Sequence, residues 1–119
     1  MRILIADDQS RVRFALRVLL EQQPNWSVVG EAARADELLE RVGALAPDLL
    51  LLDWELPGKG MLEVIPAIRQ VYPGVQVIFL SDSPEMIPAA VAVHADDFAS
   101  KTNPPDQLLS AIQGCESRR

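Results

Sequence analysis

The sequence predicts an α/β fold, a doubly wound parallel sheet with helices on both faces. Short aliphatic runs alternate with segments of helical period along the chain, which is the order of βαβ units. The run at 49–52 is four leucines, as is typical of a strand buried on both faces. With 119 residues and 49% hydrophobic content, the chain has room for one core. We therefore expect residues 1–119 to form a single domain, with no second domain in this chain.

The first half of the chain supplies three of the expected strands and two helices. The strands are Arg2 to Ala6, Ser27 to Glu31 and Asp48 to Leu52, and the helices are Ser10 to Gln23 and Ala35 to Leu45. Proline stops each helix, and Ser10 is expected to cap the first one. The residues expected to face inward are Val12, Leu16, Leu19 and Leu20, then Leu38, Leu39, Val42 and Leu45.

The second half continues the alternation. A helix from Met61 to Val71, through Leu62, Ile65 and Ile68 with Pro66 inside it, precedes a strand from Val75 to Leu80. The remaining elements are a helix within Pro84 to Val93, a strand at Asp96 to Ala99 and a helix from Pro104 to Gln113, with Asn103 as its cap. This set predicts a flavodoxin-like (βα)5 sheet in the order 2-1-3-4-5.

The fourth helix is expected to be irregular. Pro84 and Pro88 both fall within it, and a proline inside a helix costs roughly 3 kcal/mol. The sequence therefore predicts a short or mobile helix that begins late, near Pro88.

The charge and cysteine content exclude several classes of function. A net charge of −6 argues against direct binding of nucleic acid or of an anionic membrane, since phosphate affinity comes from lysine and arginine. The single cysteine, Cys115, excludes an intramolecular disulfide framework. No apolar run approaches a membrane span, and no signal peptide precedes the first strand. We expect a cytoplasmic protein.

Polar residues follow the strands where ligands bind in such sheets, outside the carboxyl ends. They are Asp7 and Asp8 after the first strand, Asp53 after the third, Ser81 after the fourth and Lys101 after the fifth. Crowded carboxylates need a cation, and oxygen ligands suit Mg²⁺. With Mg²⁺, an aspartate can attack phosphorus while an ammonium and a hydroxyl neutralise the equatorial oxygens. Asp53 is the best nucleophile candidate because it ends the central strand.

These residues resemble those of bacterial response-regulator receiver domains over nearly the whole chain. The likeness rests on Ile5-Ala6-Asp7-Asp8, Leu52-Asp53-Trp54-Glu55-Leu56-Pro57, Leu80-Ser81 and Phe98-Ala99-Ser100-Lys101 in this order. The segment Thr102-Asn103-Pro104 resembles regulators that carry a LuxR-type helix-turn-helix output domain.

The resemblance implies a role for each matching residue. Asp53 would accept the phosphoryl group, and Asp8, Asp53 and the Glu55 backbone carbonyl would bind Mg²⁺ directly, with Asp7 acting through water. Ser81 and Lys101 would hold the phosphoryl oxygens. Phe98, which by its position alone is equally well a packed core residue, would reorient on activation.

The resemblance also implies partners. A sensor histidine kinase would supply the phosphoryl group, and the change would pass to an output domain in a longer chain or to a partner. The face from the fourth to the fifth helix would carry this signal and could support a homodimer. The protein would be a switch in a two-component system and not a turnover enzyme.

Three alternatives stay open. One is a degenerate receiver that serves only as a protein-interaction or dimerisation module. Another is a haloacid-dehalogenase-like phosphotransferase, although such enzymes need an aspartate where Glu55 stands. A flavin-binding protein is the weakest, since the acidic loop after the first strand would repel a flavin phosphate.

Two positions depart from the family pattern. His94-Ala95 replaces the usual Gly-Ala before the fifth strand, which places a bulky residue where a positive φ is often needed. Thr102 replaces the common proline after Lys101. The sequence therefore does not by itself predict a cis peptide bond there.

Overall fold

The structure is a computed structural model that describes residues 1–58, 60–101 and 104–119. Its five parallel strands lie in the order β2-β1-β3-β4-β5, which confirms the predicted flavodoxin-like fold. The strands are β1 (Arg2–Ala6), β2 (Ser27–Ala32), β3 (Leu49–Asp53), β4 (Gln76–Leu80) and β5 (Asp97–Ala99).

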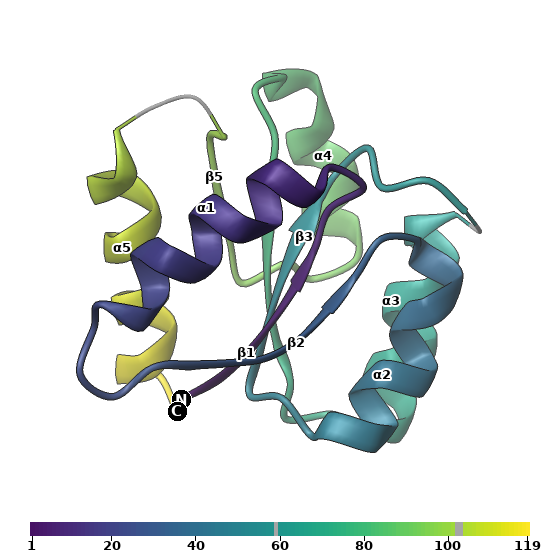
Figure 1. The fold of residues 1–119 in the computed structure, drawn as a ribbon. Coiled ribbons are helices and arrows are strands. Elements are labelled where there is room, and N and C mark those ends of the chain that lie inside the picture. Colours follow the sequence, from purple (N-terminus) through teal and green to yellow (C-terminus); the bar gives the residue numbers. More distant parts are fainter. Residues whose placement is uncertain (59, 102–103) are drawn as a thin grey trace.

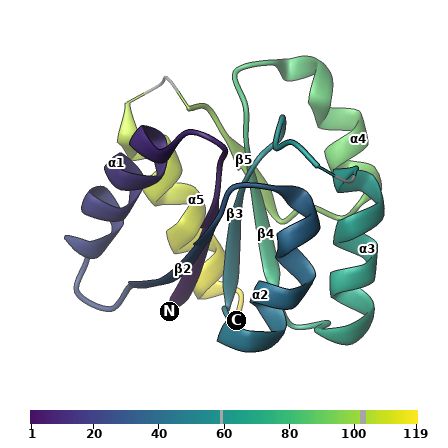
Figure 2. The ribbon, with the colours of Figure 1, turned by 45° about the vertical axis from the view of Figure 1, so that its right-hand side comes forward.

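Helices cover both faces of the sheet (Figure 1). Helices α1 (Ser10–Glu21) and α5 (Pro105–Ser117) lie on one face, and α2 (Leu38–Leu45), α3 (Met61–Val71) and α4 (Ile87–Ala92) lie on the other, as Figure 2 shows from a second side. Short 3-10 turns, η1 (Ala35–Glu37) and η2 (Pro84–Met86), precede α2 and α4. No helix among residues 1–58, 60–101 and 104–119 is long and apolar enough to cross a membrane.

The alternation of side chains along the strands divides the core into two layers. Leu50 and Leu52 of β3 pack with Phe79 of β4 against α2, α3 and α4. Leu49 and Leu51 of the same strand pack against α1 and α5. All five residues of β3 are buried, because the central strand has covered neighbours on every side.

The inward position predicted for Leu39 is wrong, because its side chain is 44% exposed. Leu62, in the apolar run of the predicted third helix, is 49% exposed. Leu38, Leu39 and Val42 all belong to α2, where successive residues are about 100° apart around the helix axis. Leu38 and Val42 lie one turn apart and are buried as predicted, together with Ala35 of η1, whereas Leu39 lies at the edge of that face. Leu62 lies in the first turn of α3, beside the buried Met61.

The helix ends also differ in part from the predictions. Helix α1 ends at Glu21, two residues early, and Ser10 is its first residue and not its cap. Gln9 holds the N-cap position of α1. Among the described residues, no side chain forms a capping hydrogen bond at this end of α1. Helix α5 extends to Ser117. The predicted cap at Asn103 and the peptide bond at Thr102 lie outside the described residues.

The prediction for the fourth helix is confirmed in its shape. After η2, helix α4 begins at Ile87 and has six residues, with Pro88 in its first turn. A proline is tolerated there because the first amides of a helix have no partner within it. His94, just past the end of α4, has a φ of 60°, as its place before β5 predicted.

Helix α3, by contrast, continues through Pro66 as predicted. The missing N–H leaves the Leu62 carbonyl without its helical partner, at a cost of about 3 kcal/mol. Four buried residues of this helix offset that cost, namely Met61, Val64, Ile65 and Ile68.

Candidate functional site

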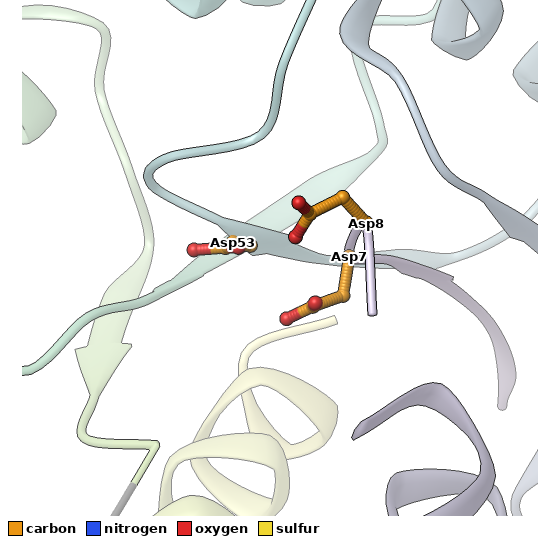
Figure 3. A group of neighbouring side chains, drawn as sticks. All are labelled: Asp7, Asp8 and Asp53. Carbon is orange, nitrogen blue, oxygen red and sulfur yellow. The ribbon is translucent and has the colours of Figure 1, made fainter. Parts of the chain in front are cut away.

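Three carboxylates meet at the carboxyl ends of β1 and β3. One oxygen from each of Asp7, Asp8 and Asp53 lies within 4.8 Å of the other two, and Figure 3 shows the three side chains gathered there. Asp7 is fully buried and Asp53 is 5% exposed, whereas Asp8 is exposed. Because β1 and β3 are parallel neighbours in the sheet, residues that follow their last buried positions must lie side by side.

Backbone amides and one arginine fix the loop after β1. Asp7 Oδ1 accepts the N–H of Gln9 at 2.9 Å, and the Asp7 carbonyl accepts Arg13 Nη1 at 2.6 Å. The Asp7 amide donates to the Ala32 carbonyl at 3.0 Å. These bonds of Asp7 fix the turn that leads into α1.

The loop after β3 holds Asp53 from the other side. Asp53 Oδ1 accepts the Glu55 N–H at 3.1 Å. Farther along, the Pro57 carbonyl accepts the Ala35 N–H at 2.7 Å. Gly58 has a φ of 106°, and a Cβ there would lie 2.3 Å from a carboxylate oxygen of Asp36, so this turn requires glycine.

Lys101 joins the two buried carboxylates. Its Nζ lies 2.8 Å from Asp7 Oδ2 and 3.3 Å from Asp53 Oδ2. Burial alone would lower the pKa of Lys101, but the carboxylates of Asp7 and Asp53 outweigh it and raise that pKa. The ammonium therefore stays charged at neutral pH.

The pKa of the Asp53 carboxyl is raised, with burial as the largest cause and the charge of Asp7 as a further one. The Glu55 amide and Lys101 act in the opposite direction and do not overcome it. One ammonium therefore does not balance the buried negative charge. The donor set fits a divalent cation, since three close carboxylates offer hard oxygen ligands to an ion such as Mg²⁺.

The other predicted site residues lie along the same rim. Ser81 lines an open pocket of about 490 Å³ together with Asp53, Glu55 and Lys101. The Ser81 hydroxyl oxygen accepts the Ser83 N–H at 3.0 Å, so the hydroxyl is engaged within its own loop. Glu55 is exposed, and ligation by its carbonyl stays a prediction.

Phe98 lies close to Ser81. It is partly buried and packs against the α2–α4 layer of the core. A second open pocket, of about 340 Å³, is lined by both Ser81 and Phe98. Trp54, the neighbour of Asp53, is partly exposed as predicted, and its ring meets Phe79 edge to face at 5.0 Å.

The sequence analysis missed one residue of this rim, Asp82. It lines the same pocket as Asp53 and Lys101. The signal was available, because Asp82 is the second residue after β4 and so lies at the edge where polar residues were sought.

A comparison with protein families identifies one model, described as the response regulator receiver domain, that matches residues 3–113. Among curated relatives, the nitrate/nitrite response regulator protein NarL of Escherichia coli K12 is 34% identical over 112 residues, covering 92% of this chain and 52% of that protein. The transcriptional regulatory protein YhcZ of Bacillus subtilis is 35% identical over 116 residues, covering 95% and 54%. The chain thus spans about half the length of the curated relatives it matches.

Solved structures give the same result. A LuxR-family two-component response regulator from Aurantimonas sp. SI85-9A1 matches with a TM-score of 0.90 and 30% identity, covering 99% of this chain and 86% of that one. The non-phosphorylated receiver domain of the stress response regulator RcsB from Escherichia coli matches with a TM-score of 0.89 and 26% identity, covering 100% and 95%.

Proposed function

Because this chain belongs to the response regulator receiver domain family, with LuxR-family regulators among its relatives, we propose that it is a phosphorylation switch that accepts a phosphoryl group on Asp53. The observation that carries this proposal is the contact of Lys101 with both Asp7 and Asp53. It puts a cation beside a buried carboxylate at the rim where three acidic residues meet.

The phosphoryl group would come from a phosphohistidine of a sensor histidine kinase. An Asp53 carboxylate oxygen forms the new bond to phosphorus, the P–N bond breaks, and the histidine nitrogen leaves with the electron pair and takes up a proton. Lys101, already 3.3 Å from Asp53 Oδ2, is placed to hold an oxygen of the transferred group. The chain takes up one group for each molecule and is therefore a switch and not a turnover enzyme.

Asp7, Asp8, Asp53 and the Glu55 carbonyl would hold Mg²⁺. When bound, the ion neutralises carboxylate charge and polarises the phosphoryl oxygens. Burial raises the pKa of Asp53, so its carboxyl group ionises less readily than that of a solvent-exposed aspartate. A cation at these carboxylates would favour ionisation.

The conformational response would start at Ser81. Its O–H donates to the Ser83 carbonyl at 3.5 Å and would have to turn from it to donate to an oxygen of a phosphoryl group on Asp53. Ser81 and Phe98 line one pocket, so movement of the serine opens space next to the ring. The repacked face would be α4, β5 and α5, and it would pass the signal to an output domain or to a second copy of the chain.

The test uses acetyl phosphate as the donor, with Mg²⁺, and intact mass spectrometry as the readout. Wild-type protein should gain the mass of one phosphoryl group, and Asp53→Asn should gain none. Glu40→Gln, which neutralises an exposed carboxylate on α2, is the control and should react as wild type does. An adduct on Asp53→Asn would show the assignment to be wrong. No adduct on wild type would favour the degenerate receiver, and continuous release of phosphate would favour the phosphotransferase.

A further inference from the structure

One carboxylate oxygen joins the loops that follow β4 and β5. Asp82 Oδ1 accepts the Ser100 hydroxyl at 2.5 Å and the Lys101 backbone N–H at 3.0 Å. Hydrogen bonds from hydroxyl or amide groups to an ionised carboxylate are shorter and stronger than neutral ones. We call this pair of bonds the Asp82 clasp.

The Asp82 clasp lies just past the end of β5, where the backbone is no longer part of the sheet. Strand β5 has three residues and ends at Ala99, whose carbonyl accepts the Ser81 N–H at 3.0 Å. Beyond Ala99, the Ser100 N–H reaches Gln107 Oε1 at 3.3 Å, and the Lys101 N–H reaches Asp82. The backbone of Lys101 is therefore held by a side chain from the neighbouring loop.

The ammonium of Lys101 depends on that backbone position. The lysine has a long, flexible side chain, and its Nζ contacts two carboxylates on β1 and β3 at 2.8 and 3.3 Å. When the loop shifts, this side chain has to change rotamer to keep both contacts, so a fixed backbone lowers the cost of holding the ammonium between the two carboxylates.

We propose that Asp82 is a positioning residue that sets Lys101 in place at the acidic rim. Its effect on phosphoryl transfer rests on the proposed function, whereas its effect on Lys101 does not. Asp82 is also the next residue after Ser81, so the clasp ties the loop that carries the responding hydroxyl to the loop that carries the lysine. Movement of one loop is then transmitted to the other.

The kinetic test compares three variants in phosphoryl uptake from acetyl phosphate at saturating Mg²⁺. Asp82→Ala should lower the rate about fivefold, the effect of one hydrogen bond of typical net strength. Asp82→Asn keeps an acceptor oxygen and should retain most of the rate. Glu85→Ala removes an exposed carboxylate from the same segment, which accepts the Ser83 hydroxyl, and should behave as wild type does.

A double-mutant cycle shows whether Asp82 acts through Lys101. In a Lys101→Ala background, Asp82→Ala should cause no further loss, because the group that it positions is gone. The same fivefold loss in that background would overturn the proposal. So would equal losses for Asp82→Ala and Asp82→Asn, which would assign the effect to charge alone.

The structural test needs no phosphoryl donor and so stands even if Asp53 proves not to be phosphorylated. In the ¹H–¹⁵N spectrum of the unphosphorylated protein, Asp82→Ala should move the Lys101 amide proton upfield and speed its hydrogen exchange, because the bond to a carboxylate is lost. Asp82→Asn should cause a smaller change and Glu85→Ala almost none. An unchanged Lys101 amide in Asp82→Ala would disprove the clasp, whereas failure of wild type to take up phosphate would refute only the proposed function.

Discussion

The two sides of the acidic rim are built differently. The side formed by β1 and β3 presents Asp7 and Asp53, both buried, from strands whose apolar residues are almost wholly enclosed. The side formed by β4 and β5 presents Ser81 and Lys101 next to a three-residue strand and a six-residue helix, α4. The buried residue of that helix is Ala90, and Ile87 is 40% exposed.

We infer from this difference that the two sides of the acidic rim have different roles. Fixed charges have to be held against their mutual repulsion, which requires rigid and well-buried supports. A response to a new charge requires a segment whose alternative arrangements lie close in free energy, and such segments have little buried apolar area. Stability should be divided between the two sides in the same way.

The largest expected effect concerns the core of the fixed side. Leu50→Ala should lower the free energy of unfolding by about 2–5 kcal/mol, because Leu50 is fully buried in the central strand. Ile87→Ala, on α4, should lower it by less than about 1 kcal/mol because the side chain keeps contact with solvent. Urea unfolding followed by circular dichroism measures both. Equal losses would mean that α4 is as firmly anchored as β3.

The next effect comes from the buried charge itself. With Mg²⁺ chelated at pH 7, Asp53→Asn should raise the free energy of unfolding by on the order of 1 kcal/mol, since it removes an incompletely compensated charge. The raised pKa of Asp53 determines how the free energy of unfolding depends on pH. The favourable contribution of the protonated Asp53 carboxyl is present below its unfolded pKa and is lost as pH rises through its folded pKa. Wild type and variant should therefore converge at low pH, and a variant less stable than wild type at pH 7 would contradict this.

A smaller effect concerns two residues with strained backbone conformations, one next to α2 and one next to α4. Among the described residues, Ala46 at the end of α2 and His94 past the end of α4 have positive φ without being glycine. Replacing either by glycine should stabilise the fold by about 0.5–1 kcal/mol. Hydrogen exchange distinguishes the two variants: His94→Gly should slow exchange mainly around α4, whereas Ala46→Gly should slow it around α2. Identical exchange maps would remove the distinction between the sides.

The smallest effect concerns an ion-pair cluster outside the rim. Glu31 on β2 pairs with Arg13 and Arg17 of α1 at 2.8 and 2.7 Å. The hydrogen bond from Arg17 is the main reason that the pKa of Glu31 is lowered, so its contribution is present above the unfolded pKa and lost as pH falls through the folded pKa. Glu31→Gln should cost about 0.5 kcal/mol at pH 7 and nothing in acid, the opposite pH trend to Asp53→Asn. Thermal melts across pH measure it.

The features of the fold and of the site that depend on burial and strand order could be predicted from the sequence. Four successive leucines predicted the central strand, and the rule that ligands bind at the carboxyl ends of strands predicted that Asp7, Asp8, Asp53 and Lys101 lie together, as they do. The irregular α4 was predicted because proline acts through its own ring, independently of tertiary context.

What the sequence analysis missed depends on tertiary detail. Leu39 lies next to the buried Leu38 in α2, and the sequence pattern does not tell which of two adjacent leucines faces the sheet. Ser10 looked like a cap because of its residue type, yet the first helical bond runs from the Arg13 N–H to the Gln9 carbonyl, which puts Ser10 inside the first turn. The position of Asp82 after β4 was a usable signal for the rim, but its bonds to Ser100 and to the Lys101 N–H join residues 18 and 19 positions apart, and no local pattern marks such a pair.

Both ends of the chain emerge at the pole of the domain opposite the acidic rim, beside each other (Figure 1). Asp48 holds them there, with Oδ2 accepting the Arg2 N–H at 2.8 Å and Oδ1 lying 2.8 Å from Arg119 Nη2. A short glycine-serine bridge between Met1 and Arg119 could therefore close the backbone into a ring, and new ends could be cut in an exposed turn such as Gly74. We expect the acidic rim to keep its structure in such a circular permutant, because its residues do not depend on where the polypeptide starts.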